Sequence, residues 1–598
     1  MTFVIWFGRF RLCRPYFLLA SRHVRTKPVV RVFVLSLSVA AFAVAAYSAE
    51  QPKAAPVTAP AVSSVKQFTH DGIAKTNLIS DESHLYVTEW LAARHIVIKY
   101  SIDGADHAVV PGRFNDFQAL DISRDHSSLL ITPMQGSADN AEFWSLPLHA
   151  GAPHKIGELA GRDASWSADG THLTYGKGSS LYIANADGTG AREVFIADES
   201  VFAPHLSVDG KRIRFTVSNV ALNTTALWEV NSDGSNSHAL LNDWQHATAA
   251  CCGGWTADGR YYIFQVTETS PTTVTTLWAL PDTANSAYNT PSQLTTGPIS
   301  FGNASMSRDT NHVWAIGVQP AGEAVKFDGA TKKFVSLLSG VSATDLDFSA
   351  DGKWATYVAV PDGTLWRCRT DGSDRRQLTP TPDRTALPRW SPDGNQIAYV
   401  SMQLGKPWKI SIISRDGGAP QDILVESHGQ IDANWSRDGS RIMFGYLRVE
   451  GGGTIRIVNL STHEVTTVPG SDGLFSPRWS PDGRYIAALS IDNTKLVLFD
   501  YKTRKWSTWL EEAAGAVSYP VWSADSKYIY FDDLVTEEES IRRVEVGSRR
   551  TEKVLKLEGI ERYPGPFGLW SGRMADGSSM FVRDRSSQEV YQLSVVLP

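Results

Sequence analysis

The chain has 598 residues, of which 42% are hydrophobic and 20% are charged, a composition typical of soluble globular domains. Lysine and arginine total 57 against 63 acidic residues, so the net charge of −6 gives no sign of a basic nucleic-acid-binding face. The cysteines are Cys13, Cys251, Cys252 and Cys368, and their spacing excludes both a disulfide framework and a zinc-ligand set.

Residues 1–49 have the pattern of an export segment. Residues 1–31 carry basic side chains and no acidic one, and Val32–Ala49 is then free of charge and ends in small residues. A cleaved signal peptide and an uncleaved transmembrane anchor both fit this pattern. Both place the rest of the chain outside the cytoplasm, so we expect a periplasmic or extracytoplasmic protein, secreted or held in the inner membrane by residues 32–49. Residues 50–64 are rich in Pro, Ala and Ser and predict a linker.

From residue 65 onward one short motif recurs, and Trp479–Gly483, WSPDG, shows it best. Proline fixes φ, aspartate bonds its own backbone and glycine accepts a positive φ, so the motif predicts a tight turn between two strands. The clearer copies begin at Trp166, Leu206, Trp255, Phe348, Trp390, Trp435, Trp479 and Trp522, and the fainter ones at Ile79, Ile122, Met306 and Arg573.

The spacing of these turns predicts the fold. Their aspartates are Asp81, Asp125, Asp169, Asp209, Asp258, Asp309, Asp351, Asp393, Asp438, Asp482, Asp525 and Asp576, separated by 40 to 51 residues. A period in the forties with strand content is typical of propeller blades. Two further strands follow each motif hairpin, which gives four antiparallel strands per blade. We therefore predict an all-β protein of tandem β-propellers.

Twelve units divide best into two six-bladed rings, residues 65–330 and 331–598. Orphan strands at the ends of each half support this, because a terminal strand can complete the last blade and remove its open edge. We expect Lys66–Thr69 to close the first ring against the Asp309 unit, and Phe334–Leu338 to close the second against the Asp576 unit. Glu589–Val595 is expected as a third strand of the last unit. Seven plus five blades, or one large irregular ring, are the alternatives.

The repeats Trp390–Ser401 and Trp479–Ser490 resemble those of the TolB-type, WD40-like β-propeller family of bacterial envelopes. The resemblance covers about residues 65–598 and implies a protein-binding envelope scaffold. The chain is also similar to the extracytoplasmic part of bacterial winged-helix membrane regulators. It departs from them because residues 1–31 are too few for a DNA-binding domain.

The candidate site residues each have a plainer structural interpretation. One aspartate per hairpin indicates turn formation rather than metal binding or acid–base chemistry. Cys251-Cys252 fits either a strained disulfide or two small apolar residues packed in a loop, and we expect the second. His246 lies five residues upstream and does not complete a zinc site. The chain has no G-x-S-x-G elbow, and its 15 histidines follow no blade period. We therefore expect no catalytic, metal-binding or cofactor-binding residue.

These patterns predict a non-catalytic propeller that binds a protein or a cell-envelope ligand and no nucleic acid. The alternatives are a membrane-anchored sensor module and a hydrolase or lyase with an active site in the propeller funnel. The gaps of 49 and 51 residues that follow Asp209 and Asp258 suggest a binding rim in the first ring. The sequence leaves open the ligand, signal cleavage and the oligomeric state.

Overall fold

The computed structural model describes residues 59–598 apart from 92–93, 135–140, 150, 220–221, 223, 269–272, 283–289, 382, 426–427, 448–452, 513–516, 535–538, 558 and 575. The predicted export segment, residues 32–49, lies outside this part of the chain. Among the described residues, no helix has the length and apolar character needed to cross a membrane.

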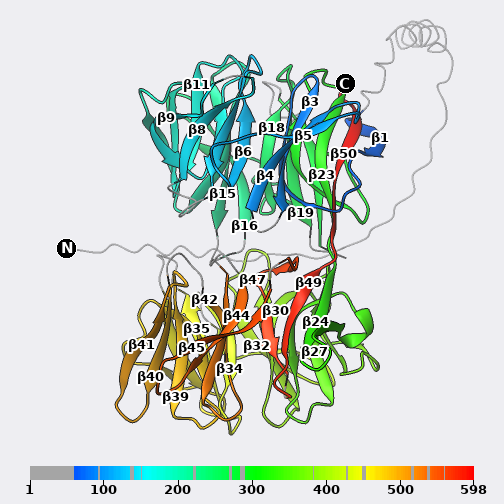
Figure 1. The fold of residues 1–598 in the computed structure, drawn as a ribbon. Coiled ribbons are helices and arrows are strands. Elements are labelled where there is room, and N and C mark those ends of the chain that lie inside the picture. The colour runs from blue at the N-terminus through cyan, green and yellow to red at the C-terminus, as the bar shows by residue number, and fades with distance from the viewer. Residues whose placement is uncertain are drawn as a thin grey trace, which may run out of the picture. The chain divides into compact units, whose positions relative to one another are not determined.

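The described residues form twelve four-stranded antiparallel sheets, and the all-β propeller prediction is confirmed (Figure 1). We number these sheets as blades 1 to 12. Blades 1–6 form ring one and blades 7–12 form ring two.

The strands of ring one are, blade by blade, β2 (Ala74–Ser80), β3 (His84–Leu91), β4 (Arg94–Ser101) and β5 (His107–Val109); β6 (Phe117–Ile122), β7 (Ser128–Pro133), β8 (Ala141–Pro147) and β9 (His154–Gly161); β10 (Asp163–Trp166), β11 (His172–Lys177), β12 (Ser180–Asn185) and β13 (Arg192–Ile196); β14 (Ser200–Leu206), β15 (Arg212–Asn219), β16 (Thr224–Asn231) and β17 (His238–Ala239); β18 (Ala250–Trp255), β19 (Tyr261–Glu268), β20 (Val274–Pro281) and β21 (Ser292–Gln293); β22 (Ser300–Met306), β23 (His312–Gln319), β50 (Ser587–Val596) and β1 (Ala61–Gln67).

The strands of ring two are, in the same way, β26 (Ala343–Phe348), β27 (Trp354–Ala359), β28 (Leu365–Arg369) and β29 (Arg376–Gln377); β30 (Arg384–Trp390), β31 (Gln396–Met402), β32 (Lys409–Ser414) and β33 (Gln421–Asp422); β34 (Gly429–Trp435), β35 (Arg441–Leu447), β36 (Gly453–Asn459) and β37 (Val465–Thr467); β38 (Leu474–Trp479), β39 (Tyr485–Ser490), β40 (Lys495–Asp500) and β41 (Lys505–Glu511); β42 (Val517–Trp522), β43 (Tyr528–Asp533), β44 (Ser540–Glu545) and β45 (Thr551–Lys556); β48 (Ser571–Arg573), β49 (Ser579–Asp584), β24 (Gly322–Asp328) and β25 (Lys333–Ser336). A two-stranded hairpin, β46 (Pro564–Gly565) and β47 (Gly568–Leu569), precedes β48, and a short 3₁₀ turn, Leu338–Gly340, precedes β26.

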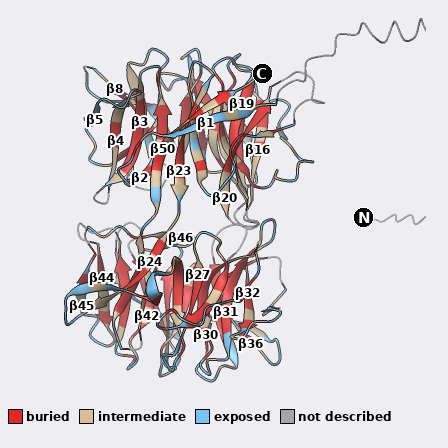
Figure 2. Cartoon of the chain, turned by 90° about the vertical axis from the view of Figure 1, so that its right-hand side faces the viewer, coloured by how far each residue is buried: buried red, intermediate tan, exposed pale blue. Residues whose placement is uncertain are grey.

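The first strands of successive blades lie against one another in two closed cycles. The order is β2, β6, β10, β14, β18, β22 and back to β2 in ring one, and β26, β30, β34, β38, β42, β48 and back to β26 in ring two. Consecutive residues of the inner strands are buried, as in Ile486–Leu489 of β39, where two residues pack against blade 9 and the two that alternate with them pack against blade 11. Buried residues are red in Figure 2. Burial of both sheet faces is therefore what holds each ring together.

The recurring motif forms the turn that its sequence predicts. In the Trp479 copy, Ser480 Oγ donates to Asp482 Oδ1 at 2.6 Å, and the backbone N–H of Arg484 donates to the same oxygen at 3.0 Å. Gly483 has a φ of 75°, which explains the glycine. All twelve turn aspartates accept a backbone N–H from their own turn. Their role as turn-formers is confirmed.

The tryptophan of the motif ties its blade to the preceding one. The indole N–H of Trp390 donates to the carbonyl of Asp347, that of Trp435 to Arg389, and that of Trp522 to Arg478. The bond lengths are 3.3, 3.0 and 3.1 Å. Each acceptor is the residue just before the corresponding motif in the previous blade. These bonds hold the motif tryptophans between neighbouring blades.

Two strands lie in the opposite ring from the one predicted. β50 pairs with β23 and β1 in ring one, with Leu593 opposite Val313, whereas β24 pairs with β49 in ring two, with Val325 opposite Phe581 (Figure 1). The boundary near residue 330 is therefore wrong: ring two occupies about residues 322–584, inserted into blade 6 of ring one. β24 and β50 are both apolar alternating strands, so neither sequence specifies its partner. The outer strands expected at Lys66–Thr69 and Phe334–Leu338 do lie in the Asp309 and Asp576 blades, as β1 and β25. β1 begins at Ala61, so the predicted linker 50–64 is wrong in its last four residues, which lie in this strand paired with β50.

The pairing of β1 with β50 in blade 6 predicts that an engineered disulfide can link these two strands. The hydroxyl oxygens of Ser64 in β1 and Ser594 in β50 lie 2.8 Å apart. The double variant Ser64→Cys, Ser594→Cys should oxidise to a cross-linked form that is about 2–4 kcal/mol more stable, because the bond closes a very long loop. Gel mobility and urea unfolding with and without reductant measure this. The pair Ser64→Cys, Ser587→Cys, with the second cysteine at the far end of β50, is the control. Failure of the Ser594 pair to cross-link would contradict the strand assignment.

Candidate functional site

The first strand of a ring-two blade carries a β-bulge at the same place in five blades. The register shifts between Thr344 and Asp347 in β26, and at the equivalent points of β30, β34, β38 and β42. The bulge residues have a positive φ although none is glycine; they are Asp345, Leu387, Asp432, Ser476 and Tyr519. A bulge redirects side chains. Here it brings polar side chains from several blades together in the channel of the ring.

Asp432 joins three neighbouring blades through its carboxylate. Its Oδ2 accepts hydrogen bonds from Ser476 Oγ at 2.6 Å and from Arg478 Nη2 at 2.8 Å, and its Oδ1 lies 3.4 Å from Arg389 Nη2. The side chains of Asp432 and Arg478 are 6% and 7% exposed. Burial alone would raise the pKa of Asp432, but Arg478, Arg389 and Ser476 outweigh it and hold that pKa below its usual value. Removing one partner from such a pair typically costs about 3–5 kcal/mol of stability.

Asp345 and Asp347 bind the backbone of the next blade. Asp345 Oδ2 accepts the N–H of Leu387 at 3.2 Å, and Asp347 Oδ2 accepts the N–H of Trp390 at 2.7 Å. Burial raises the pKa of Asp345 to about 6, and the Leu387 N–H and the Arg389 charge oppose it only in part. Burial also raises the pKa of Asp347. The channel thus holds a carboxyl group, that of Asp345, with a pKa raised to about 6.

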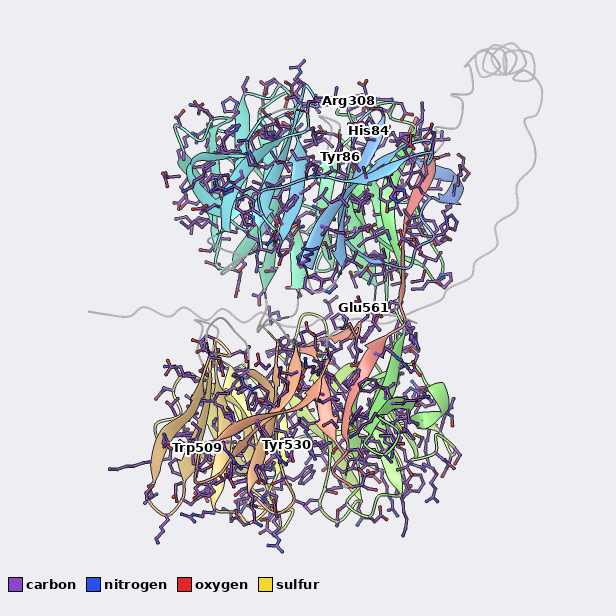
Figure 3. All side chains as sticks on the ribbon, in the orientation of Figure 1. His84, Tyr86, Arg308, Trp509, Tyr530 and Glu561 are labelled. Atoms are coloured by element: carbon purple, nitrogen blue, oxygen red, sulfur yellow. A yellow bond between two sulfur atoms is a disulfide. The ribbon has the colours of Figure 1, made fainter. Side chains whose placement is uncertain are left out.

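The β46–β47 hairpin closes one end of this channel. Tyr519 donates its hydroxyl to the carbonyl of Phe567 at 2.8 Å, and the Phe567 ring packs edge-on against Trp408 with centroids 5.2 Å apart. A Cβ at Gly565 would lie 3.1 Å from Thr344 Oγ1, so the hairpin also reaches blade 7. Before the hairpin, Arg562 forms a buried ion pair with Asp532 at 2.7 Å. Figure 3 labels Glu561, at the start of this segment, and Tyr530 towards the other end of the ring.

The opposite end of the channel opens into a cavity of about 370 Å³ at the motif turns. The first strands of all six ring-two blades line it, through Asp347, Arg389, Asn434, Arg478, Val521 and Ser571. These residues fall at or next to the position before the first residue of the motif. Arg573 also lines the cavity and lies over the ring of Tyr530, 3.5 Å from its centroid.

The cavity floor offers hydrogen-bond donors beside fixed carboxylates. Arg389 and Arg478 each use one nitrogen on Asp432 and another on the carbonyl of the preceding proline. A guanidinium has five N–H groups, so each keeps donors for a ligand. This arrangement suits recognition of a polar group held in one orientation, because the ion pairs fix the positions of the donors.

The cysteine pair singled out in the sequence is joined. Cys251 and Cys252 form a disulfide in β18 of ring one, so the expectation of two unlinked apolar residues is wrong. Cys252 is itself a bulge residue with positive φ, and Gln265 Nε2 lies 3.2 Å from Cys251 Sγ. His246 packs edge-on against Trp244. Within the described ranges, no three His, Cys, Asp or Glu side chains are grouped to hold a metal ion.

The predicted binding rim of ring one is partly tied to the core: Trp244 packs against it, whereas Asn242, Asp243 and Gln245 beside it are exposed. Trp244, in the long segment after Asp209, packs edge-on against Trp278 with centroids 4.8 Å apart and against Phe264 at 5.8 Å. Residues 269–272 and 283–289 lie outside the described residues, so the rest of that rim stays a prediction. An equally long gap, of 51 residues between Asp525 and Asp576, contains the β46–β47 hairpin at the ring-two channel.

The raised pKa of Asp345 predicts how stability varies with pH. The folded protein holds this proton up to about pH 6, whereas an unfolded aspartate loses it near pH 4, so the Asp345 contribution to stability falls as pH rises from 4 to 6. Asparagine has no proton to lose, so Asp345→Asn should not show this decrease. Between pH 4 and pH 8 the free energy of unfolding of the variant should therefore rise relative to that of the wild type by up to about 3 kcal/mol, as urea titrations at each pH would measure.

Asp438→Asn is the control for this experiment. Hydrogen bonds from Ser436 and Ser440 lower the pKa of the exposed Asp438 to about 2, so its contribution to stability is lost as the pH falls, in the opposite direction. Parallel pH profiles for wild type and Asp345→Asn would contradict the assignment.

Known proteins share stretches of this sequence. An uncharacterized peptidase of Bacillus subtilis is 29% identical over 119 residues, an uncharacterized protein of Agrobacterium fabrum is 28% identical over 114, and a TolB homologue of Chlorobium luteolum is 29% identical over 150. These matches cover 19%, 17% and 23% of the chain and only 18%, 38% and 32% of the relatives. No family model matches.

The solved structures similar to this one include a putative TolB from Agrobacterium tumefaciens, with 18% identity over 44% of this chain and 98% of that one, at a TM-score of 0.36. The tricorn protease has 13% identity over 81% and 51% of the two chains, at a TM-score of 0.32. Oligogalacturonate lyase from Vibrio parahaemolyticus has 12% identity over 59% and 96%, at 0.31. Nothing here supports the likeness to winged-helix regulators. The chain has a TolB-like β-propeller fold.

Proposed function

We propose that this protein is a non-catalytic, extracytoplasmic scaffold that binds a partner protein or cell-envelope ligand at the open end of the ring-two channel. The observation that carries the proposal is the shape of that channel, which the β46–β47 hairpin closes at one end and a cavity of about 370 Å³ opens at the other. A concave site with a few fixed polar groups is the usual form of a ligand site.

Two further observations support the location and the mode of action. The basic and then apolar pattern of residues 1–49 is typical of an exported protein. The polar groups of the channel are largely committed to holding blades together, since Asp432, Asp345 and Asp347 each bind a neighbouring blade. Such a rigid surface suits binding.

A hydrolase or lyase with a funnel site is the second candidate. One specific observation favours it: Asp345, with a pKa raised to about 6, lies in the same channel as Tyr519 and the guanidinium groups. A buried acid with a pKa near the working pH is a feature of general acid–base sites. A third hypothesis is a membrane-anchored sensor. It requires that residues 32–49 are not cleaved off and act as a transmembrane anchor.

Site-specific photo-crosslinking in intact cells tests the binding proposal. Ala350 is exposed at the rim of the cavity, and Val425 is 95% exposed in ring two but does not line it. A photoreactive residue at position 350 should capture a product that the same residue at 425 does not. Adding Arg389→Gln should lower that capture about tenfold, because a charge-assisted hydrogen bond is worth roughly 1.5 kcal/mol. Identical products from both positions, or none from position 350, would refute the proposal.

A further inference from the structure

A second cavity, of about 550 Å³, lies between blades 2 and 3 of ring one at the motif turns. Ser128, Ser145 and His154 line it from blade 2, and Trp166 and Ala186 line it from blade 3. Arg308, labelled in Figure 3, donates to the carbonyl of Arg124, which also lines the cavity. This site is separate from the channel of ring two.

The same place between blades 4 and 5 is filled by charged side chains. Arg214 lies over the indole of Trp255, 4.1 Å from its centroid, and Arg212 lies at 5.4 Å. Glu229 accepts a hydrogen bond from Arg214 at 2.7 Å, and Asp282 accepts bonds from both arginines. The motif tryptophan of blade 5 is therefore covered by two guanidinium groups and two carboxylates.

Strand register identifies the corresponding residues of blades 2 and 3. Leu129 pairs with Ile122 and Leu146 as Ile213 pairs with Leu206 and Val230. Ser128 and Leu130 thus replace the two arginines, and Ser145 replaces Glu229. Ala186 corresponds to Asp282, because its backbone N–H donates to the carbonyl of Thr171 as that of Asp282 donates to the carbonyl of Arg260. The second carboxylate is therefore replaced by a methyl group.

Trp166 is retained while the side chains that would cover it are replaced by small or apolar ones. In the other blades apart from blade 12, the position of Ser128 holds a larger residue; in blade 10 it is Tyr485, which stacks on Trp522 with centroids 6.3 Å apart. In the described part of the chain, Trp166 has no aromatic or cationic partner and its indole N–H makes no hydrogen bond. The indole thus faces the cavity.

Polar groups without partners lie on the blade-2 wall. Ser145 pairs with Leu130 on one side and with His154 on the other, so Ser128, Ser145 and His154 share one face of the sheet. Their hydroxyl and imidazole groups make no hydrogen bond to any residue that the structure describes. Ser145 as a whole is only 7% exposed and lines the cavity, so a ligand there could bond its hydroxyl.

The chemistry of this cavity selects the ligand class. The two carboxylates that hold the arginines between blades 4 and 5 are absent here, and Arg124 and Lys155 line the cavity, so a cationic ligand is not matched. Asp125, Asp169 and Asp187 line it as well and disfavour an anion. An aromatic face beside neutral hydroxyl groups fits an amphipathic ring that carries hydroxyls. We propose that this cavity binds a sugar ring of a neutral saccharide, stacked on Trp166.

Saturation-transfer NMR on the full chain tests this site. The probes are glucose, galactose and N-acetylglucosamine as free sugars, and maltotetraose as a short glycan, which separate recognition of a single ring from recognition of a chain. Ser128→Tyr should fill the cavity, since tyrosine occupies the equivalent position in other blades as Tyr261, Tyr485 and Tyr528. We expect transfer to at least one probe in the wild type, and at least tenfold weaker binding in this variant.

Gln396→Tyr, the same change at the equivalent position of blade 8, is the matched control and should bind as the wild type does. If Ser128→Tyr does not fold, Ser145→Ile serves instead, because isoleucine occupies that position in blades 3, 8 and 9. Absence of transfer to every probe would overturn the proposal, as would undiminished binding in a folded variant with the cavity filled. Neither result bears on the ring-two channel.

Discussion

A ring of blades is stable only when its last sheet leaves no open edge, and this constraint shapes the whole chain. In ring one the last sheet is completed by the first and the last strand of the described chain, β1 and β50. In ring two it is completed by β24 and β25, the strands that open the inserted segment. Both closures join residues distant in sequence, which is entropically costly to form but removes the edges that would otherwise pair with other chains. The chain therefore crosses between the rings twice.

Hydrogen bonds between first strands of neighbouring blades occur in both rings, and in ring two they are combined with a buried charged layer. Polar residues of the first strands bind the backbone of the next blade in both, as Asn77 Nδ2 does with the carbonyl of Ala119 at 2.7 Å, and Asp345 with the N–H of Leu387. Ring two adds a charged layer centred on Asp432, which costs desolvation and is stable only because both arginines pair with it. This layer, with the hairpin that closes one end, makes the ring-two channel a candidate binding site.

Much of the fold follows from the sequence because its signals are local. The WSPDG turns, the alternating strands and the period in the forties specify twelve blades, and the turn hydrogen bonds of Asp482 are those that the motif predicts. Pairing between β24 and β49 or between β23 and β50 is not local, because the paired strands are far apart in sequence. All four strands also show similar apolar alternation. Their sequences do not specify which ring each strand joins.

The candidate site was missed for a related reason. Arg389 and Arg478 stand immediately before motif tryptophans, a position that varies from blade to blade, but only the bulges show that this position meets the channel. The long gap before Asp576 was a usable signal for the hairpin. The disulfide between Cys251 and Cys252 depends on the bulge geometry of β18, which their sequence does not reveal.

Hydrogen–deuterium exchange of the full chain, with and without the partner captured at position 350, tests whether the open end of the ring-two channel is the binding site. With the partner bound, we predict slower exchange in the turns that follow β26, β30, β34 and β38, which surround the open end of the ring-two channel, and no change in the β46–β47 hairpin at the closed end. Protection confined to that hairpin, or to ring one, would contradict this prediction.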